Sequence, residues 1–115
     1  MKTSMALAAL VLMAASGGGQ AASFDCAKAS APDEIAICQS IVLSALDSEM
    51  GAYWHVQQRL DWGMSGRQQI DDDAKTFLDG RTKCGPNVQC LQSHYTARID
   101  SLKQSVDDWL KNAAQ

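Results

Sequence analysis

Apolar residues recur every three or four positions along most of the chain, a spacing that predicts amphipathic helices. Pro32 followed by Asp33 and Glu34 marks the first start, because proline suits the first helical turn and carboxylates suit the positive end of the helix dipole. Ser40 is a candidate cap for a second start. We therefore expect residues 33–61 to form either one kinked helix or a short helix followed by a long one. The stripe consists of Ile35, Cys38, Val42, Leu46, Met50, Tyr53 and Leu60.

Two further helices are expected after a turn at residues 62–66. Ser65 begins a capping-box pattern, and a second stripe then runs to Cys84, where a Gly-Pro-Asn turn at residues 85–87 ends it. A third helix is expected over residues 88–112. No segment of the sequence alternates apolar and polar residues over the length of a strand. The pattern predicts an all-α, small antiparallel bundle of three main helices.

The N-terminal stretch has the order of features found in a secretory signal. Lys2 supplies a positive charge, residues 5–15 are all apolar, and small residues lead to Ala21, after which cleavage is expected. The apolar run is too short to cross a bilayer core, which takes about 20 helical residues. We expect residues 1–21 to be a signal peptide and residues 22–115 to be one periplasmic or secreted domain without a membrane anchor.

The charge of the chain restricts its partners. Ten basic and 13 acidic residues give a formal net charge of −3, and loss of Lys2 with the signal makes the exported domain more acidic. An acidic domain disfavours nucleic acid and anionic membranes, and it attracts cationic proteins. A charge of this size is also what solubility alone requires.

The cysteines form two close pairs, Cys26 with Cys38 and Cys84 with Cys90. In an exported domain they are expected to form two disulfides. Local pairing is favoured because the second pair flanks a tight turn and the first joins neighbouring segments, although cross-pairing stays open. The alternative, a zinc site of Cys84, Cys90 and His94, lacks the usual ligand spacing. We expect no metal, no cofactor and no redox catalysis.

Few residues are suited to catalysis. His55 and His94 are the only histidines, and each lies off the apolar stripe of its predicted helix, where a structural role is favoured. The run Asp71, Asp72 and Asp73 lacks the glycine and the distal glutamate of a calcium-binding EF-hand loop, so a solvated helix face is the expected structure. We therefore expect that the protein is not an enzyme.

Arg81 and Arg98 fall on the second and third predicted helices. Arginine is well suited to partly buried ion pairs because its planar guanidinium matches a carboxylate. We expect structural ion pairs with Asp47 or Glu49 across the bundle rather than a ligand-binding role.

The three tryptophans occupy different kinds of position. Trp54 and Trp109 lie on or beside helical stripes and are expected in the core. Trp62 lies in the turn beside Asp61 and Gly63. There it either caps the end of the bundle or stands exposed as a binding anchor.

The cysteines also lie within a longer pattern. Its first block is Phe24-Asp25-Cys26-x-Lys28-Ala29, followed by Glu34, Ile37-Cys38, Leu43, Leu46-Asp47, Glu49 and Tyr53. Its second block is Phe77, Arg81, Cys84, Cys90-Leu91, Tyr95, Arg98 and Leu102. With these residues the chain resembles the LprI-like family of secreted bacterial proteins, which is named for a lysozyme inhibitor. Phe77 stands where the family more often has tryptophan, and residues 61–70 match nothing in its pattern.

The resemblance implies an α-helical, disulfide-linked domain of the envelope or the secreted fraction. Our leading hypothesis is a protein-binding domain that occludes a partner enzyme, a cationic lysozyme, without catalysis. A negatively charged inhibitor would gain association rate toward such a partner. The alternative is a structural or accessory envelope domain with another partner. The residues expected to make the contact are Asp61, Trp62, Asp71, Asp72 and Asp73.

Overall fold

The computed structural model describes residues 22–115, so the expected signal peptide, residues 1–21, lies outside the described residues. This part of the chain is all-α, as the sequence predicts, and contains no strand. A short 3-10 helix precedes four α-helices, where three main helices were expected. The elements are η1 (Cys26–Lys28), α1 (Pro32–Gln39), α2 (Ile41–Arg59), α3 (Gly63–Cys84) and α4 (Val88–Ala113).

The extra helix arises at Ser40, which breaks the first helical segment in two. Its backbone is extended, and its hydroxyl accepts a hydrogen bond from Leu43 N at 3.2 Å, which caps α2. Ser44 Oγ donates to Ile37 O at 2.7 Å and so satisfies a carbonyl at the end of α1. The two helices meet at 106°. Of the two alternatives, two helices in series is confirmed and a single kinked helix is wrong.

The predicted start of α3 at Ser65 is wrong. Gly63 is the first residue of α3 and has a positive φ of 66°, while Asp61 Oδ1 accepts a hydrogen bond from Gly63 N at 3.0 Å. This local turn begins the helix before Ser65, whose side chain then lies within the first turn. The start of α4 follows the sequence, because Asn87 Oδ1 accepts from Cys90 N at 2.9 Å.

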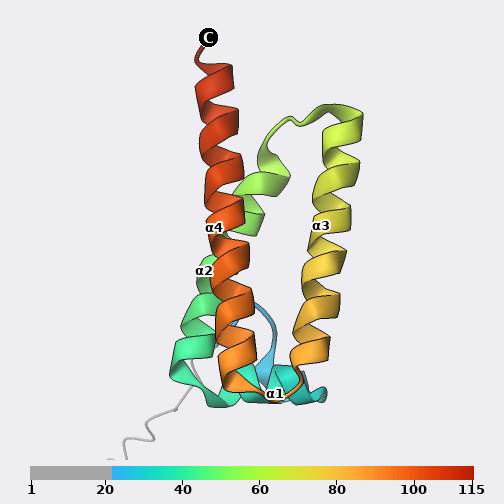
Figure 1. Ribbon diagram of the computed structural model, residues 1–115, viewed down its shortest axis with the longest axis vertical. Coiled ribbons are helices and arrows are strands. Elements are labelled where there is room, and N and C mark those ends of the chain that lie inside the picture. The colour runs from blue at the N-terminus through green and yellow to red at the C-terminus, as the bar shows by residue number, and fades with distance from the viewer. Residues whose placement is uncertain (1–21) are drawn as a thin grey trace, which may run out of the picture.

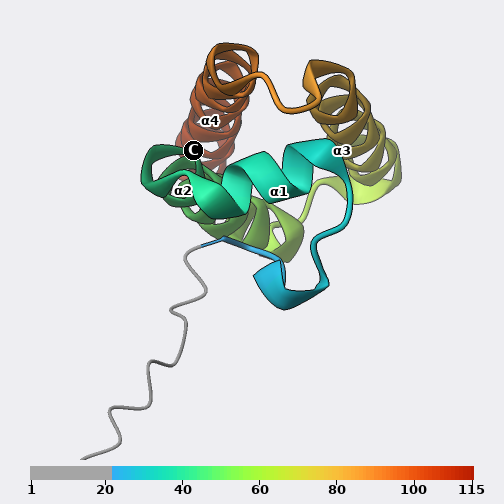
Figure 2. The same cartoon turned by 90° about the horizontal axis from the view of Figure 1, so that it is seen from below.

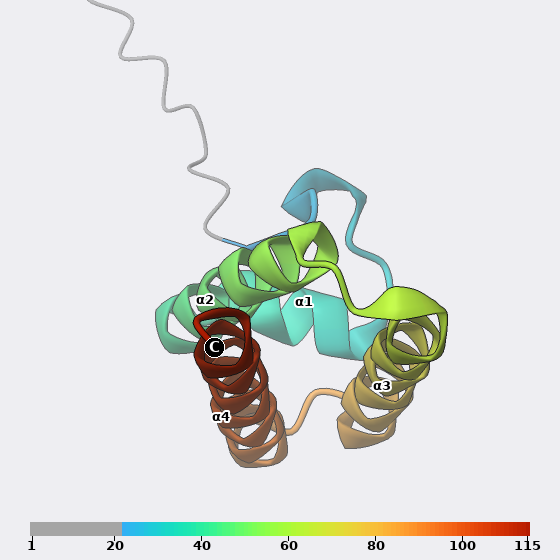
Figure 3. The ribbon, with the colours of Figure 1, turned by 90° about the horizontal axis from the view of Figure 1, so that it is seen from above.

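The helices form an open bundle with α1 across one end. α2 packs along α4, α3 packs against α4, and α1 crosses the lower end and contacts all three (Figures 1 and 2). α2 and α3 do not pack directly against each other, and Figure 3 shows them separated when viewed from above. α3 is therefore held mainly through α4 and α1.

The hydrophobic core lies along the seam between α2 and α4 and is closed below by α1. Its most deeply buried apolar side chains come from these three helices, whereas α3 contributes Ile70 and Phe77. On α3 and α4 the buried side chains follow the predicted stripes. On the first segment the predicted stripe is partly wrong, because the chain bends by 106° at Ser40: Ile35 and Val42 are 39% and 54% exposed, and their neighbours Ile37 and Leu43 are buried instead. The buried set includes Ile37, Leu43, Leu91, Tyr95 and Leu102.

Both disulfides are local, which confirms the favoured pairing. Cys26–Cys38 joins the N-terminal segment to α1, and Cys84–Cys90 joins the end of α3 to the start of α4. Because the latter two cysteines are bonded to each other, they do not form the alternative zinc site. Such bonds belong to an oxidising compartment. No single helix within residues 22–115 has the length and hydropathy of a membrane span. Only α1 and α2 taken together have them, and these two helices form a sharply bent pair.

One buried carboxylate joins three parts of the fold. Asp47 on α2 is completely buried and accepts hydrogen bonds from Tyr95 Oη at 2.6 Å and from the backbone N–H of Ser23. A buried carboxylate is costly unless it is hydrogen-bonded, so this arrangement fixes α2, α4 and the N-terminal segment relative to one another.

A glycine allows α3 and α4 to approach near the second disulfide. The His94 ring stacks on Phe77 with centroids 4.8 Å apart, and Nε2 donates to Phe77 O at 2.7 Å. A Cβ placed on Gly80 would lie 2.4 Å from His94 Cε1. Since the imidazole is held by both contacts, it has little freedom to move away from an added methyl group.

Replacing this glycine should therefore reverse the usual sign of a Gly→Ala change in a helix. Gly80→Ala is expected to lower the free energy of unfolding by about 1–3 kcal/mol through overpacking. In a His94→Ala background the same change should instead stabilise by about 0.5–1 kcal/mol, which is the ordinary helix effect. Urea unfolding of the four variants measures both increments. A stabilising Gly80→Ala in the parent would contradict the close approach.

The Tyr95 hydroxyl should make stability depend on alkaline pH. Burial, followed by the hydrogen bond to Asp47, raises the pKa of Tyr95 above its ordinary value. The folded state therefore favours the neutral phenol, and this contribution is complete below about pH 10 and is lost as the pH rises further.

Tyr95→Phe is expected to lower the free energy of unfolding by about 1–3 kcal/mol at neutral pH, because Asp47 loses a donor. Above pH 10 the variant should lose less stability than the parent does, because it has no phenol at this position to ionise. The matched control Tyr53→Phe should retain the alkaline loss of the parent. Denaturant midpoints between pH 7 and pH 11 provide the comparison. If the stability of the parent and of Tyr95→Phe depended on pH in the same way, Tyr95 would not be the source of the alkaline loss.

Candidate functional site

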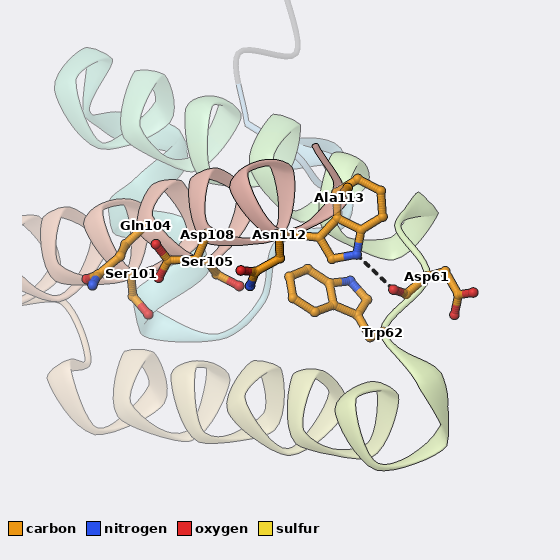
Figure 4. A pocket seen from close by; sticks show the side chains of 9 residues that line it. Asp61, Trp62, Ser101, Gln104, Ser105, Asp108, Asn112 and Ala113 are labelled. Atoms are coloured by element: carbon orange, nitrogen blue, oxygen red, sulfur yellow. Dashed lines mark hydrogen bonds between the residues drawn. The ribbon is translucent and has the colours of Figure 1, made fainter. Parts of the chain in front are cut away.

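An open cavity lies where the α2–α3 turn meets the last turns of α4. We call it the bundle-end cavity; its volume is about 680 Å³. Figure 4 shows its side chains, which come from the turn and from one face of α4. The lining residues are Asp61, Trp62, Ser101, Gln104, Ser105, Asp108, Trp109, Asn112 and Ala113.

Two half-buried tryptophans dominate this cavity. Trp109 Nε1 donates to Asp61 O at 2.8 Å (Figure 4), and Trp62 Nε1 donates to Gln57 O at 2.8 Å. Their ring centroids lie 6.5 Å apart with the planes tilted by 58°. Each indole is thus fixed by a backbone carbonyl while part of its surface stays accessible, an arrangement typical of interface anchors.

The ionisable groups lining the bundle-end cavity are two carboxylates. Asp61 and Asp108 are both exposed. Lys111 lies 3.9 Å from Asp108, but this pair is solvent-exposed and contributes little. The cavity therefore combines aromatic surface with negative charge.

Trp109 is not in the core, so that expectation is wrong. The apolar stripe of α4 is buried from Leu91 to Leu102, whereas Trp109 is half-buried and Leu110 is 52% exposed. The cause is helix length: the last turns of α4 extend past the neighbouring ends of α2 and α3 (Figure 1). Trp54 does pack against the core from the edge.

The structure brings together only some of the residues expected to make the partner contact. Asp61 and Trp62 line the bundle-end cavity. Asp73 lines an adjoining cavity between α3 and α4, which shares Ser101 with the first. Asp71 and Asp72 are exposed on α3 and line neither cavity.

Asp108 and Trp109 belong to the cavity but were not among the predicted binding residues. The expected spans gave no signal for this, because residues 88–112 form a shorter span than residues 33–61; only the observed break at Ser40 leaves α2 shorter than α4.

Arg81 pairs with α1 and not with the carboxylates expected from the sequence. Its Nε donates to Asp33 Oδ2 at 2.7 Å, and its Nη2 lies 3.8 Å from Glu34 Oε1. Burial acts to lower the pKa of Arg81, but Tyr95 and Asp33 outweigh it and raise the pKa. The cause is position, because the last turns of α3 lie against the start of α1.

The other predicted partners of the arginines are already engaged elsewhere. Asp47 is bonded to Tyr95 as described above, and Glu49 lies 3.4 Å from Lys103. Neither carboxylate pairs with Arg81 or Arg98, so the expected ion pairs across the bundle are wrong.

Arg98 forms no salt bridge within the described part of the chain. Its Nε is buried without a hydrogen-bond partner, and its guanidinium carbon lies 5.8 Å from the Phe77 ring centroid. Burial lowers the pKa of Arg98, and the negative charge of Asp73 opposes this shift in part. Arg98 is thus a poorly solvated cation with spare donors.

The histidines are both engaged in local contacts. His55 Nε2 accepts from Arg59 Nε at 3.1 Å on the surface of α2, and His94 stacks on Phe77. Among residues 22–115, no three metal-binding side chains come together.

These features define a small disulfide-linked helical domain with an aromatic and acidic cavity at one end. No family model, curated protein or solved structure matches the chain. The likeness to the LprI-like family stays a prediction from the sequence pattern.

The same substitution should destabilise the domain much more at Arg81 than at Arg98. Arg81→Gln leaves the Asp33 carboxylate, which is 2% exposed, without its cation and should cost about 3 kcal/mol. Arg98→Gln removes an unpaired cation and should change the free energy of unfolding by less than about 1 kcal/mol. Urea denaturation at neutral pH measures both, and similar losses would show that Arg98 has a partner of equal importance.

Proposed function

We propose that this protein is a periplasmic or secreted protein-binding domain that occludes a partner enzyme through its bundle-end cavity, without catalysis. The observation that carries the proposal is the pair Trp62 and Trp109, fixed by backbone hydrogen bonds and flanked by Asp61 and Asp108. Aromatic anchors of this kind supply much of the binding energy in protein interfaces.

The fixed indoles lower the cost of binding. A side chain that is already held in one rotamer loses little conformational entropy when a partner covers it. Trp62 and Trp109 are each held by a hydrogen bond to a carbonyl oxygen in the free domain. Preorganised anchors therefore support a binding role for this end of the bundle.

The charge favours a cationic partner. The chain has a net charge of −3, and Asp61 and Asp108 place carboxylates beside the anchors. Complementary charge raises the association rate and excludes acidic partners. The choice of a cationic lysozyme as that partner rests on the resemblance to the LprI-like family.

The exported domain, residues 22–115 with oxidised cysteines, is expected to slow cell-wall lysis by a cationic lysozyme in a dose-dependent manner. Trp62→Ala should weaken binding roughly 10- to 30-fold, because it removes an anchor. Ile41→Ala removes a side chain that is 90% exposed at the opposite end and should have no effect. Undiminished lysis at large molar excess over several lysozyme types would exclude lysozyme as the partner.

Two double variants with equal net charge should show whether the carboxylates of the bundle-end cavity or the acidic run on α3 attract the partner. Asp61→Asn with Asp108→Asn is expected to slow association and to reduce its salt dependence, because it removes charge beside the anchors. Asp71→Asn with Asp72→Asn should change the association rate and its salt dependence much less. Surface plasmon resonance at several salt concentrations gives the rates; equal effects would show that overall charge, and not this cavity, governs binding.

A further inference from the structure

A second cavity, of about 350 Å³, lies between α2 and α3 beside the N-terminal segment. We call it the α2–α3 cavity. It shares no lining residue with the bundle-end cavity. Its apolar lining consists of Phe24, Met50, Trp54, Ala74, Phe77 and Leu78.

The cavity follows from how the helices pack. α2 and α3 each pack against α1 and α4 but not against each other. Phe24 of the N-terminal segment lies beside the space between them, with its ring centroid 5.4 Å from the guanidinium carbon of Arg81. The result is an apolar recess bounded by elements that other contacts hold in place.

Arg98 brings to this recess a positive charge that the more distant Asp73 attracts but does not bond. It lines the α2–α3 cavity, its Nε is buried without a hydrogen-bond partner, and it makes no salt bridge within residues 22–115. Arg81 and Glu34 also line the cavity, and the charge of Arg81 is balanced by Asp33 and by Glu34 itself. Arg98 is therefore the cation available to an incoming anion, and burial strengthens such a pairing because it excludes competing water.

We propose that the α2–α3 cavity binds a small amphiphilic carboxylic acid, whose apolar body fills the recess and whose carboxylate pairs with Arg98. A guanidinium matches a carboxylate in shape as well as in charge. The volume lies at the lower end of the range of about 300–1,000 Å³ found for small-molecule sites. This binding goes beyond the proposed contact with a partner enzyme, because it uses no residue of the bundle-end cavity.

Three probes separate the apolar and ionic parts of the interaction. Sodium decanoate below its micelle concentration has both parts, decanol has only the apolar chain, and acetate has only the charge. Decanoate is expected to bind saturably, decanol at least tenfold more weakly, and acetate without saturation. Calorimetry gives the affinities, and the NMR signal of the Trp54 indole N–H should shift with decanoate. Equal affinity for decanoate and decanol, or no saturable binding of decanoate, would overturn the proposal.

Substitutions then test whether the carboxylate of decanoate pairs with Arg98. Arg98→Gln should weaken decanoate binding at least tenfold and leave decanol unchanged, whereas Arg59→Gln, which removes an arginine from an exposed position outside the cavity, should alter neither. Leu78 is 47% exposed at the cavity, so Leu78→Glu should weaken decanoate more than Leu78→Gln does. An Arg98→Gln domain that binds decanoate as the parent does would overturn the pairing.

A decanoate titration of Trp62→Ala distinguishes ligand binding in the α2–α3 cavity from partner binding at the bundle-end cavity. Trp62→Ala should bind decanoate with unchanged affinity, because Trp62 lines only the bundle-end cavity. Loss of decanoate binding in Trp62→Ala would contradict the separate site, whatever the outcome with lysozyme.

Discussion

The buried carboxylate of Asp47 is the constraint on which the rest of the fold depends. Removing a carboxylate from water is costly unless donors replace the lost hydration, and here those donors come from Tyr95 on α4 and from Ser23 in the N-terminal segment. Satisfying one charge therefore sets the register of α2 against α4 and places the N-terminal segment across α2. Phe24 follows directly in sequence and lies against the α2–α3 cavity.

Contacts between the helices are unevenly distributed along the bundle. At the lower end, α1, both disulfides and the Arg81–Asp33 pair hold all four helices together. At the upper end α4 continues past its neighbours (Figure 1), and Trp109 in its final turns bonds to Asp61 in the turn before α3. Aromatic surface that would be core in a longer bundle is left partly accessible there, and this places the tryptophan pair at the surface proposed for partner binding.

The two arginines show how position changes the role of one residue type. Arg81 lies near the end of α3, where α1 supplies carboxylates, and it acts as a structural cation. Arg98 lies in the middle of α4, opposite Phe77 and the apolar edge of α3, and no carboxylate is close enough to bond it. A cation kept in such surroundings is poorly solvated, and that is the physical basis for assigning it a carboxylate ligand.

The sequence by itself determined most of the local structure of residues 22–115, with the start of α3 as an exception. The helix start at Pro32, the Ser40 cap, the turn at residues 85–87 and the pairing of neighbouring cysteines all depend on groups close in the chain, whose geometry is nearly independent of the rest. Only the tertiary structure decided what distant groups do. The partners of Arg81 and Arg98, the exposure of Trp109 and the separation of Asp71 and Asp72 from Trp62 depend on how far each helix extends and which neighbour it meets. Periodicity fixes which face of a helix is apolar, but it does not fix which other helix, or none, covers that face.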